Sequence, residues 1–190
     1  MSDNQVGRTL FASTASPAAN ARRMLAKLAN AGLVHLFRAP AHPEISLREP
    51  VISWAPGGLM PDLGHVAYVL NRRWTRPPVL TTCVCATRKG RNLFNGRGGK
   101  PPEVKLTHDL HLAAVYLALL RSDPVAAKYW ISEEQVRLER ERLDERIPDA
   151  IVRKPGAPPR VIEFGGTYKK PKLEAFHRHC SFHSLAYEIW

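Results

Sequence analysis

The sequence predicts an α+β fold in which a small N-terminal domain precedes an α/β domain whose mixed sheet is flanked by helices. Apolar residues recur at three- and four-residue spacing in residues 17–31 and 108–121, as on the buried face of a helix. Two short apolar runs, residues 147–152 and 161–164, are joined by a Pro/Gly-rich loop, as in a β-hairpin. The Thr-Arg-Pro-Pro segment at 75–78 has the composition of a linker between the two domains.

The balance of charges predicts a polyanionic partner. Lys and Arg number 28 against 17 Asp and Glu, a net charge of +11, and a protein with this excess most often meets nucleic acid. A basic protein without such a partner is the alternative, because net charge describes non-specific attraction and defines no site. No run approaches about 18 apolar residues and the N-terminus lacks the order of a signal peptide, so we expect a cytoplasmic protein without membrane contact.

The first domain, predicted over residues 17–76, follows a polar segment of residues 1–16 that is expected to be a tail or at most one short helix. A Ser-Pro pair at 16–17 suits the start of a helix, Gly32 ends it, and residues 32–38 form a strand. This helix and strand resemble the recognition helix and wing of a winged helix-turn-helix. We expect DNA contacts from Arg22, Arg23, Lys27 and Arg38. An ordinary amphipathic surface helix with solvated charges is the alternative.

The remainder of the first domain is predicted to be an extended wing and a closing helix. Prolines interrupt residues 39–62, so short strands are expected at 44–47 and 51–54. A helix over residues 63–74 opens at Asp62, whose side chain can cap it.

A Gly-rich basic loop follows the predicted strand at 79–87. Its glycines make it flexible and its cations suit a phosphate backbone. The predicted DNA contacts in this loop are Arg88, Lys89, Arg91, Arg97 and Lys100. A solvated hairpin loop explains the same composition equally well.

The second domain is predicted over residues 77–190. Thr107 caps a helix at 108–121 whose broad apolar face indicates burial against a sheet. Further elements are expected as a strand at 128–131, a charged segment at 132–146, a helix at 171–182 and a strand at 186–189. Histidines and a cysteine between 177 and 183 lack a second ligand pair at zinc-finger spacing, so we do not expect a structural zinc.

Two carboxylates of the predicted hairpin form a candidate metal site. Asp149 and Glu163 can lie opposite each other on adjacent strands, where facing Cβ atoms are about 5 Å apart. Such a pair repels unless a cation lies between the two groups, and hard oxygen ligands suit Mg²⁺ or Mn²⁺. Glu133 is a candidate third ligand, with helix capping as its alternative role. Lys169 and Lys170, with Lys172 beyond them, bring positive charge for a phosphate.

The segments around these acids resemble the PD-(D/E)XK nuclease superfamily. Pro148-Asp149 and Glu163 match its acids, but Gly165 stands where its lysine is usual, so Lys169 or Lys170 would have to reach back. Together with Trp130-Ile131-Ser132-Glu133 and Thr167-Tyr168-Lys169, these segments resemble the plasmid replication-relaxation family. That resemblance implies a DNA-binding helical domain followed by a degenerate nuclease-like domain.

Two functions follow from the resemblance and the charge. The first is a DNA-binding protein of a mobile genetic element, acting in plasmid or phage replication, transfer or transcription control. In it, an inactive nuclease-like domain positions the DNA reader or forms a homodimer. The alternative is a metal-dependent endonuclease with Asp149 and Glu163 as metal ligands and Lys169 or Lys170 stabilising the transition state. An interaction module without DNA is a third class.

Overall fold

The computed structural model describes residues 1–94, 96, 99–139 and 146–190. It confirms the α+β class and the mixed sheet. The chain forms two compact units, which we call unit 1 (Met1–Glu44 with Arg76–Ala114) and unit 2 (Ile45–Thr75 with Val115–Trp190). These units cut across the predicted domain boundary after residue 76, because the strands of each unit pair with partners distant in the sequence.

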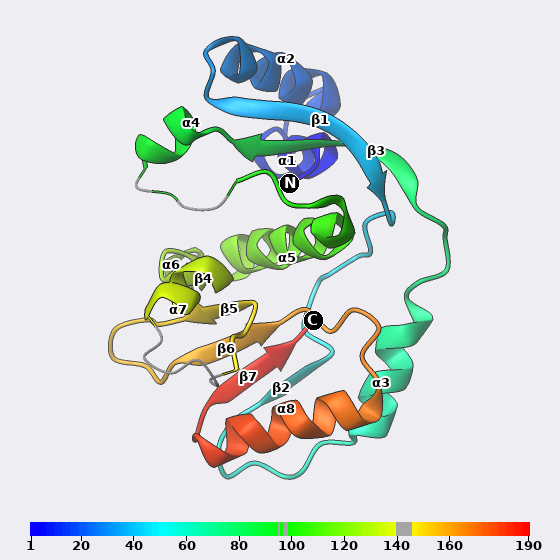
Figure 1. The fold of residues 1–190 in the computed structure, drawn as a ribbon, viewed down its shortest axis with the longest axis vertical. Helices are drawn as coiled ribbons and strands as arrows, with labels where there is room; N and C mark the ends of the chain where they lie inside the picture. Colours follow the sequence, from blue (N-terminus) through cyan, green and yellow to red (C-terminus); the bar gives the residue numbers. More distant parts are fainter. Residues whose placement is uncertain (95, 97–98, 140–145) are drawn as a thin grey trace. The chain divides into compact units, whose positions relative to one another are not determined.

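Unit 1 is built on a two-stranded antiparallel sheet (Figure 1). Strand β1 (Val34–Ala41) pairs along its whole length with β3 (Val79–Ala86), from Val34 opposite Ala86 to Ala41 opposite Val79. The helices of the unit are α1 (Asp3–Leu10), α2 (Pro17–Asn30), α4 (Arg88–Asn92) and the first part of α5 (Glu103–Ser122).

Of the two alternatives for residues 1–16, the structure has the short helix, α1 (Asp3–Leu10), for a local reason. Ser2 caps α1 by accepting a hydrogen bond from the Gln5 amide, and the Gln5 side chain accepts one from the Ser2 amide. Val6 of this helix is buried in a cluster with Ala21 and Leu25 of α2. The apolar stripe predicted on α2 is therefore confirmed as a packing face, and its partner is the segment assigned to the tail.

The two strands expected in the wing, at residues 44–47 and 51–54, do not form a wing together. Residues 44–47 are not a strand, and β2 (Ile52–Trp54) pairs antiparallel with β7 (Ala186–Ile189) in unit 2. The long helix α5 starts at Glu103, before the predicted cap Thr107. The Thr107 hydroxyl instead accepts a hydrogen bond from the His42 amide at 3.1 Å.

Unit 2 contains the mixed five-stranded sheet, in the order β2-β7-β6-β5-β4. Strands β4 (Trp130–Ser132), β5 (Ala150–Val152) and β6 (Arg160–Glu163) form an antiparallel meander, which includes the predicted hairpin, and β6 runs parallel to β7. Helix α8 (Lys170–Phe182) makes the crossover between these parallel strands. The unit also contains α3 (Leu63–Arg72), α6 (Pro124–Ala127), α7 (Glu133–Glu139) and the second part of α5.

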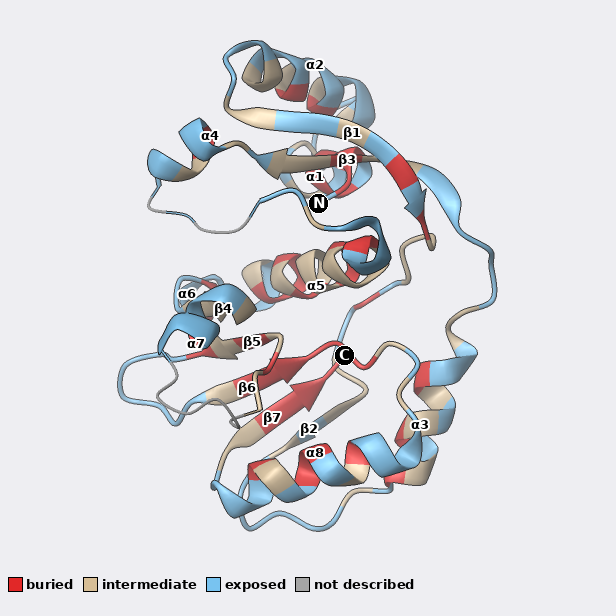
Figure 2. Ribbon diagram, in the orientation of Figure 1, coloured by how far each residue is buried: buried red, intermediate tan, exposed pale blue. Residues whose placement is uncertain are grey.

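The core of unit 2 lies between the sheet and the pair α3 and α8, which lie side by side (Figure 1). Asp62 caps α3 as predicted, accepting a hydrogen bond from the His65 amide at 3.0 Å. Buried residues run along β6 and β7 (Figure 2), where Val161, Tyr187 and Ile189 pack against Leu70 and Phe176 of the two helices. Because alternate residues of a strand share a face, Glu163 lies on this same helix-covered face.

Candidate functional site

The hairpin brings the two predicted acids together. Ala150 pairs with Ile162, so Asp149 and Glu163 follow as the next opposite positions. The Asp149 amide nitrogen lies 3.4 Å from Glu163 Oε2, and the Phe164 amide donates to Asp149 Oδ2 at 2.8 Å. The two carboxylates therefore lie at the same end of β5 and β6, as the sequence predicted, with Asp149 bonded to the Phe164 amide and Glu163 close to the Asp149 amide.

Glu163 is the more buried of the two acids, with 4% of its surface exposed. Tyr168 donates its hydroxyl to Glu163 Oε1 at 2.7 Å, and Arg146 Nη2 lies 3.9 Å from the same oxygen. Burial, reinforced by the charge of Asp149, raises the pKa of Glu163 to about 7, although Tyr168 and Arg146 favour its ionised form. At neutral pH, a carboxyl with this pKa is protonated in a substantial fraction of the molecules.

The lysine whose pKa reflects the charges of both acids is Lys172, which the prediction set beyond Lys169 and Lys170. Lys170 Nζ lies 3.7 Å from Glu174 Oε1, one turn along α8, and Lys169 is exposed before the first turn of that helix. Lys172 Nζ lies 3.3 Å from the centre of the Tyr168 ring. Burial lowers the pKa of Lys172, while the charges of Glu163 and Asp149 raise it.

Gly165 stands at the usual lysine position because that position faces the core. A Cβ atom built there would lie 2.6 and 2.7 Å from the two methyl carbons of Leu70 and 3.0 Å from Ile189 Cγ2. Leu70 and Ile189 are both fully buried. The close packing of α3 on the end of β6 therefore excludes a lysine at residue 165.

Glu133 does not join the acid pair as a third ligand. Its carboxylate pairs with Arg137 one turn along α7, and its amide donates to the Asp149 carbonyl at 3.0 Å. Across the described ranges, no group of three or more His, Cys, Asp and Glu side chains is placed to hold a metal ion. Asp149 and Glu163 could supply two oxygen ligands to Mg²⁺ or Mn²⁺, with the remaining positions left to water.

Two of the segments that carry predicted DNA contacts, α2 and α4, meet at the carboxyl end of α2. Lys89 Nζ donates to the Ala31 carbonyl at 2.9 Å, and Thr87 Oγ1 donates to the Gly32 carbonyl at 2.7 Å. These bonds fix α4 at the carboxyl end of α2. Gly90 permits this approach, since a Cβ there would lie 2.1 Å from the Leu33 carbonyl oxygen.

The cations predicted to contact DNA differ in what they contact within the protein. Arg22 pairs with Asp3 at 3.3 Å, Arg91 Nε lies 3.4 Å from the Thr87 carbonyl oxygen, and Lys100 lies over the Phe37 ring at 4.7 Å. Four further cations predicted to contact DNA are exposed: Arg23, Lys27, Arg38 and Arg88. Arg97, also predicted to contact DNA, lies outside the described residues. We define Arg23, Lys27, Arg88 and Lys89 as the α2–α4 basic surface.

Replacing Gly90 with alanine tests the close packing of α4 against the segment that follows α2. The added methyl group meets a backbone oxygen that cannot rotate away, so we expect a loss of about 1–2 kcal/mol in the free energy of unfolding. Urea unfolding measures the loss. Gly99→Ala is the matched control, because no atom lies within 4 Å of a Cβ at that position. Equal stability of the two variants would contradict the assigned contact.

Sequence reasoning missed Tyr168 and Arg146 as parts of the site, and it named Lys172 only as a cation beyond Lys169 and Lys170. Tyr168 stands five residues after Glu163, within the Thr167-Tyr168-Lys169 segment that resembles the plasmid replication-relaxation family. That resemblance was the sequence feature that could have indicated a role for Tyr168. Arg146 ends a charged run of a kind that is usually solvated, so no sequence pattern indicated its position beside Glu163.

No helix among the described residues has the length and apolar character needed to cross a membrane. Comparisons with protein-family models, with curated proteins and with solved structures each found no match.

Proposed function

We propose that this chain is a DNA-binding protein of a mobile genetic element, with a nuclease-like second unit that does not cleave. The observation that carries the proposal is the α2–α4 basic surface, on which cations from two distant segments are joined by the Lys89 and Thr87 hydrogen bonds. The net charge of +11 supports the same partner. The role in plasmid or phage replication, transfer or transcription control rests on the resemblance alone.

The absence of cleavage is supported by the surroundings of the acids. Gly165 is packed too closely to be replaced by the usual lysine, and the substitute Lys172 rests on the Tyr168 ring. Glu163 accepts a hydrogen bond from Tyr168 and faces Arg146, which competes with a metal ion for the same carboxylate. The raised pKa of Glu163 further weakens metal binding, because a metal ligand must be deprotonated.

A metal-dependent endonuclease is the second candidate, favoured by the convergence of Asp149, Glu163 and Lys172. A bound Mg²⁺ or Mn²⁺ would supply Lewis-acid chemistry. Asp149 and Glu163 would hold the ion, and Lys172 would stabilise negative charge on the scissile phosphate. Arg146 would have to leave Glu163 for these residues to act.

The DNA-binding proposal predicts a salt dependence that the α2–α4 basic surface controls. We expect the logarithm of the duplex-DNA affinity to fall linearly with the logarithm of salt concentration. The triple variant Arg23→Gln, Lys27→Gln, Arg88→Gln should reduce that slope by about 3, roughly one unit for each lost phosphate contact. Fluorescence anisotropy with a labelled duplex at several salt concentrations measures both quantities.

The matched control removes the same charge from unit 2 by Lys128→Gln, Lys154→Gln and Arg178→Gln, all at exposed positions. An equal reduction in slope for this control would show that net charge, and not the α2–α4 surface, binds DNA. Supercoiled plasmid incubated with Mg²⁺ or Mn²⁺ should remain intact while bound. Nicking that Asp149→Asn abolishes would establish the endonuclease in place of the non-cleaving protein.

A further inference from the structure

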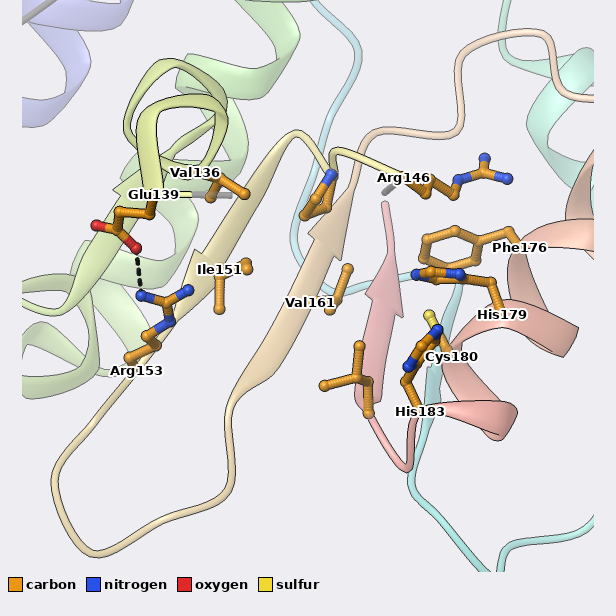
Figure 3. A pocket seen from close by; sticks show the side chains of 12 residues that line it. Val136, Glu139, Arg146, Ile151, Arg153, Val161, Phe176, His179, Cys180 and His183 are labelled. Carbon is orange, nitrogen blue, oxygen red and sulfur yellow. Dashed lines mark hydrogen bonds and ion pairs between the residues drawn. The ribbon is translucent and has the colours of Figure 1, made fainter. Parts of the chain in front are cut away.

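A cavity with a volume of about 480 Å³ lies in unit 2 beside the acid pair (Figure 3). Ile151 of β5 and Val161 of β6 line it, and Phe176 of α8 forms part of the opposite wall. Asp149 and Glu163 stand two residues from Ile151 and Val161 on these same strands. Since alternate residues share a face of the sheet, the cavity and the acid pair lie on the same face.

The walls of the cavity combine aromatic surface with positive charge. Two arginines and one glutamate are its charged lining residues. The Arg146 guanidinium lies 5.1 Å from the centre of the Phe176 ring, and Arg153 pairs with Glu139 on the other side of the cavity (Figure 3). His179 and His183 of α8 add two more rings, with centroids 4.6 Å apart.

We propose that this cavity binds one nucleotide unit, with its base on the apolar and aromatic surface beside Phe176 and its phosphate at Arg153. Bases stack on aromatic side chains, and arginines bind phosphate through paired charged hydrogen bonds. The volume falls within the roughly 300–1,000 Å³ of small-molecule sites. A bare phosphate would leave the surface of Ile151, Val161 and Phe176 uncovered. A purely apolar ligand would remove water from the Arg153–Glu139 ion pair without making a polar contact to it.

The nucleotide has two chemical sources, a free mononucleotide or an unpaired nucleotide of a DNA strand. Only the second source rests on the proposed function. Arg146 connects the cavity with the acids, because it lines the cavity and its Nη2 lies 3.9 Å from Glu163 Oε1. A nucleotide with its base on Phe176 would lie beside Arg146 and therefore close to the acid pair.

Titration calorimetry of the full chain with deoxyadenosine monophosphate tests the proposal. We expect binding that is at least about tenfold tighter than that of inorganic phosphate or of deoxyadenosine, because each of these supplies half of the contacts. Arg153→Gln should weaken mononucleotide binding about tenfold through the loss of a charged hydrogen bond. Arg153→Lys should restore part of the affinity, since it retains the charge without the planar fork.

Glu139→Gln should have the opposite effect and tighten binding severalfold, because it removes an anion from the cavity and the ion-pair partner of Arg153. Arg178→Gln is the matched control, on the same helix as His179 but exposed and outside the cavity lining. Equal losses for Arg153→Gln and Arg178→Gln, or equal affinities for the mononucleotide and inorganic phosphate, would overturn the proposal.

Oligonucleotides separate the two sources of the nucleotide. Competition by a single-stranded oligonucleotide, but not by a blunt duplex, would identify an unpaired nucleotide of DNA as the occupant. Competition by neither would identify the free mononucleotide. Duplex binding that depends on salt, without any mononucleotide binding, would refute this inference and leave the proposed function standing. Mononucleotide binding without duplex binding would support this inference and refute the proposed function.

Discussion

Replacing Glu163 with glutamine is expected to stabilise the protein by about 3 kcal/mol at pH 8 and to change its stability little at pH 4.5. The ordinary pKa of this carboxyl is 4.5, and burial beside Asp149 raises its pKa to about 7 in the folded protein. Between these values the folded protein retains a proton that the unfolded chain releases. The stability that Glu163 contributes is therefore complete below about pH 4.5 and is lost as the pH rises through 7.

Urea unfolding of both proteins at intervals from pH 4.5 to 8 measures this difference. Glutamine still accepts the Tyr168 hydrogen bond, but it carries no charge to repel Asp149. Glu174→Gln is the matched control, because this less buried glutamate pairs with Lys170 on the same helix face. A difference between Glu163→Gln and the unaltered protein that stays constant with pH would show that Glu163 titrates normally.

Replacing Gly165 with alanine is expected to lower the free energy of unfolding by about 2–3 kcal/mol. The added methyl group meets Leu70 and Ile189 at distances that require the core to move. Both neighbours are fully buried, so neither side chain has open space into which it can rotate. Urea unfolding at one pH gives the loss directly.

A second substitution distinguishes this clash from a backbone effect of glycine. Leu70→Ala alone should destabilise by about 2–5 kcal/mol through the cavity that it leaves. The double variant Leu70→Ala, Gly165→Ala should be more stable than the sum of the two losses predicts, because the new methyl group enters space that Leu70 vacated. Strict additivity would indicate that the glycine is needed for its backbone conformation and not for space.

The sequence predicted the parts of the fold that depend on neighbouring residues. The hairpin of β5 and β6 followed from two apolar runs and a Pro/Gly loop, and the start of α3 followed from Asp62. The pairing of β1 with β3 and of β2 with β7 joins segments separated by 38 or more residues. Strand patterns indicate that a partner is needed but not which strand supplies it. The predicted domain boundary failed for this reason.

The candidate site also has a part that could be predicted from neighbouring residues and a part that could not. Asp149 and Glu163 could be placed together because a hairpin fixes the positions that face each other. The choice of lysine could not be made, because it depends on the direction in which α8 leaves the turn after Gly166. Lys172, one turn into α8, reaches the Tyr168 ring, whereas Lys170 points to Glu174. Helical periodicity places residues on faces only once the helix start is known.

The pairing of β2 with β7 has a consequence for synthesis of the protein on the ribosome. Trp54, at the end of β2, pairs with Tyr187, which lies 133 residues later in the sequence (187 − 54 = 133). At about 5–20 residues per second, the ribosome needs on the order of 10 s to make the intervening segment. During that interval the backbone of β2 has no strand to bond with. Nascent chains should therefore expose this short apolar segment to chaperones until the residues of β7 have been made.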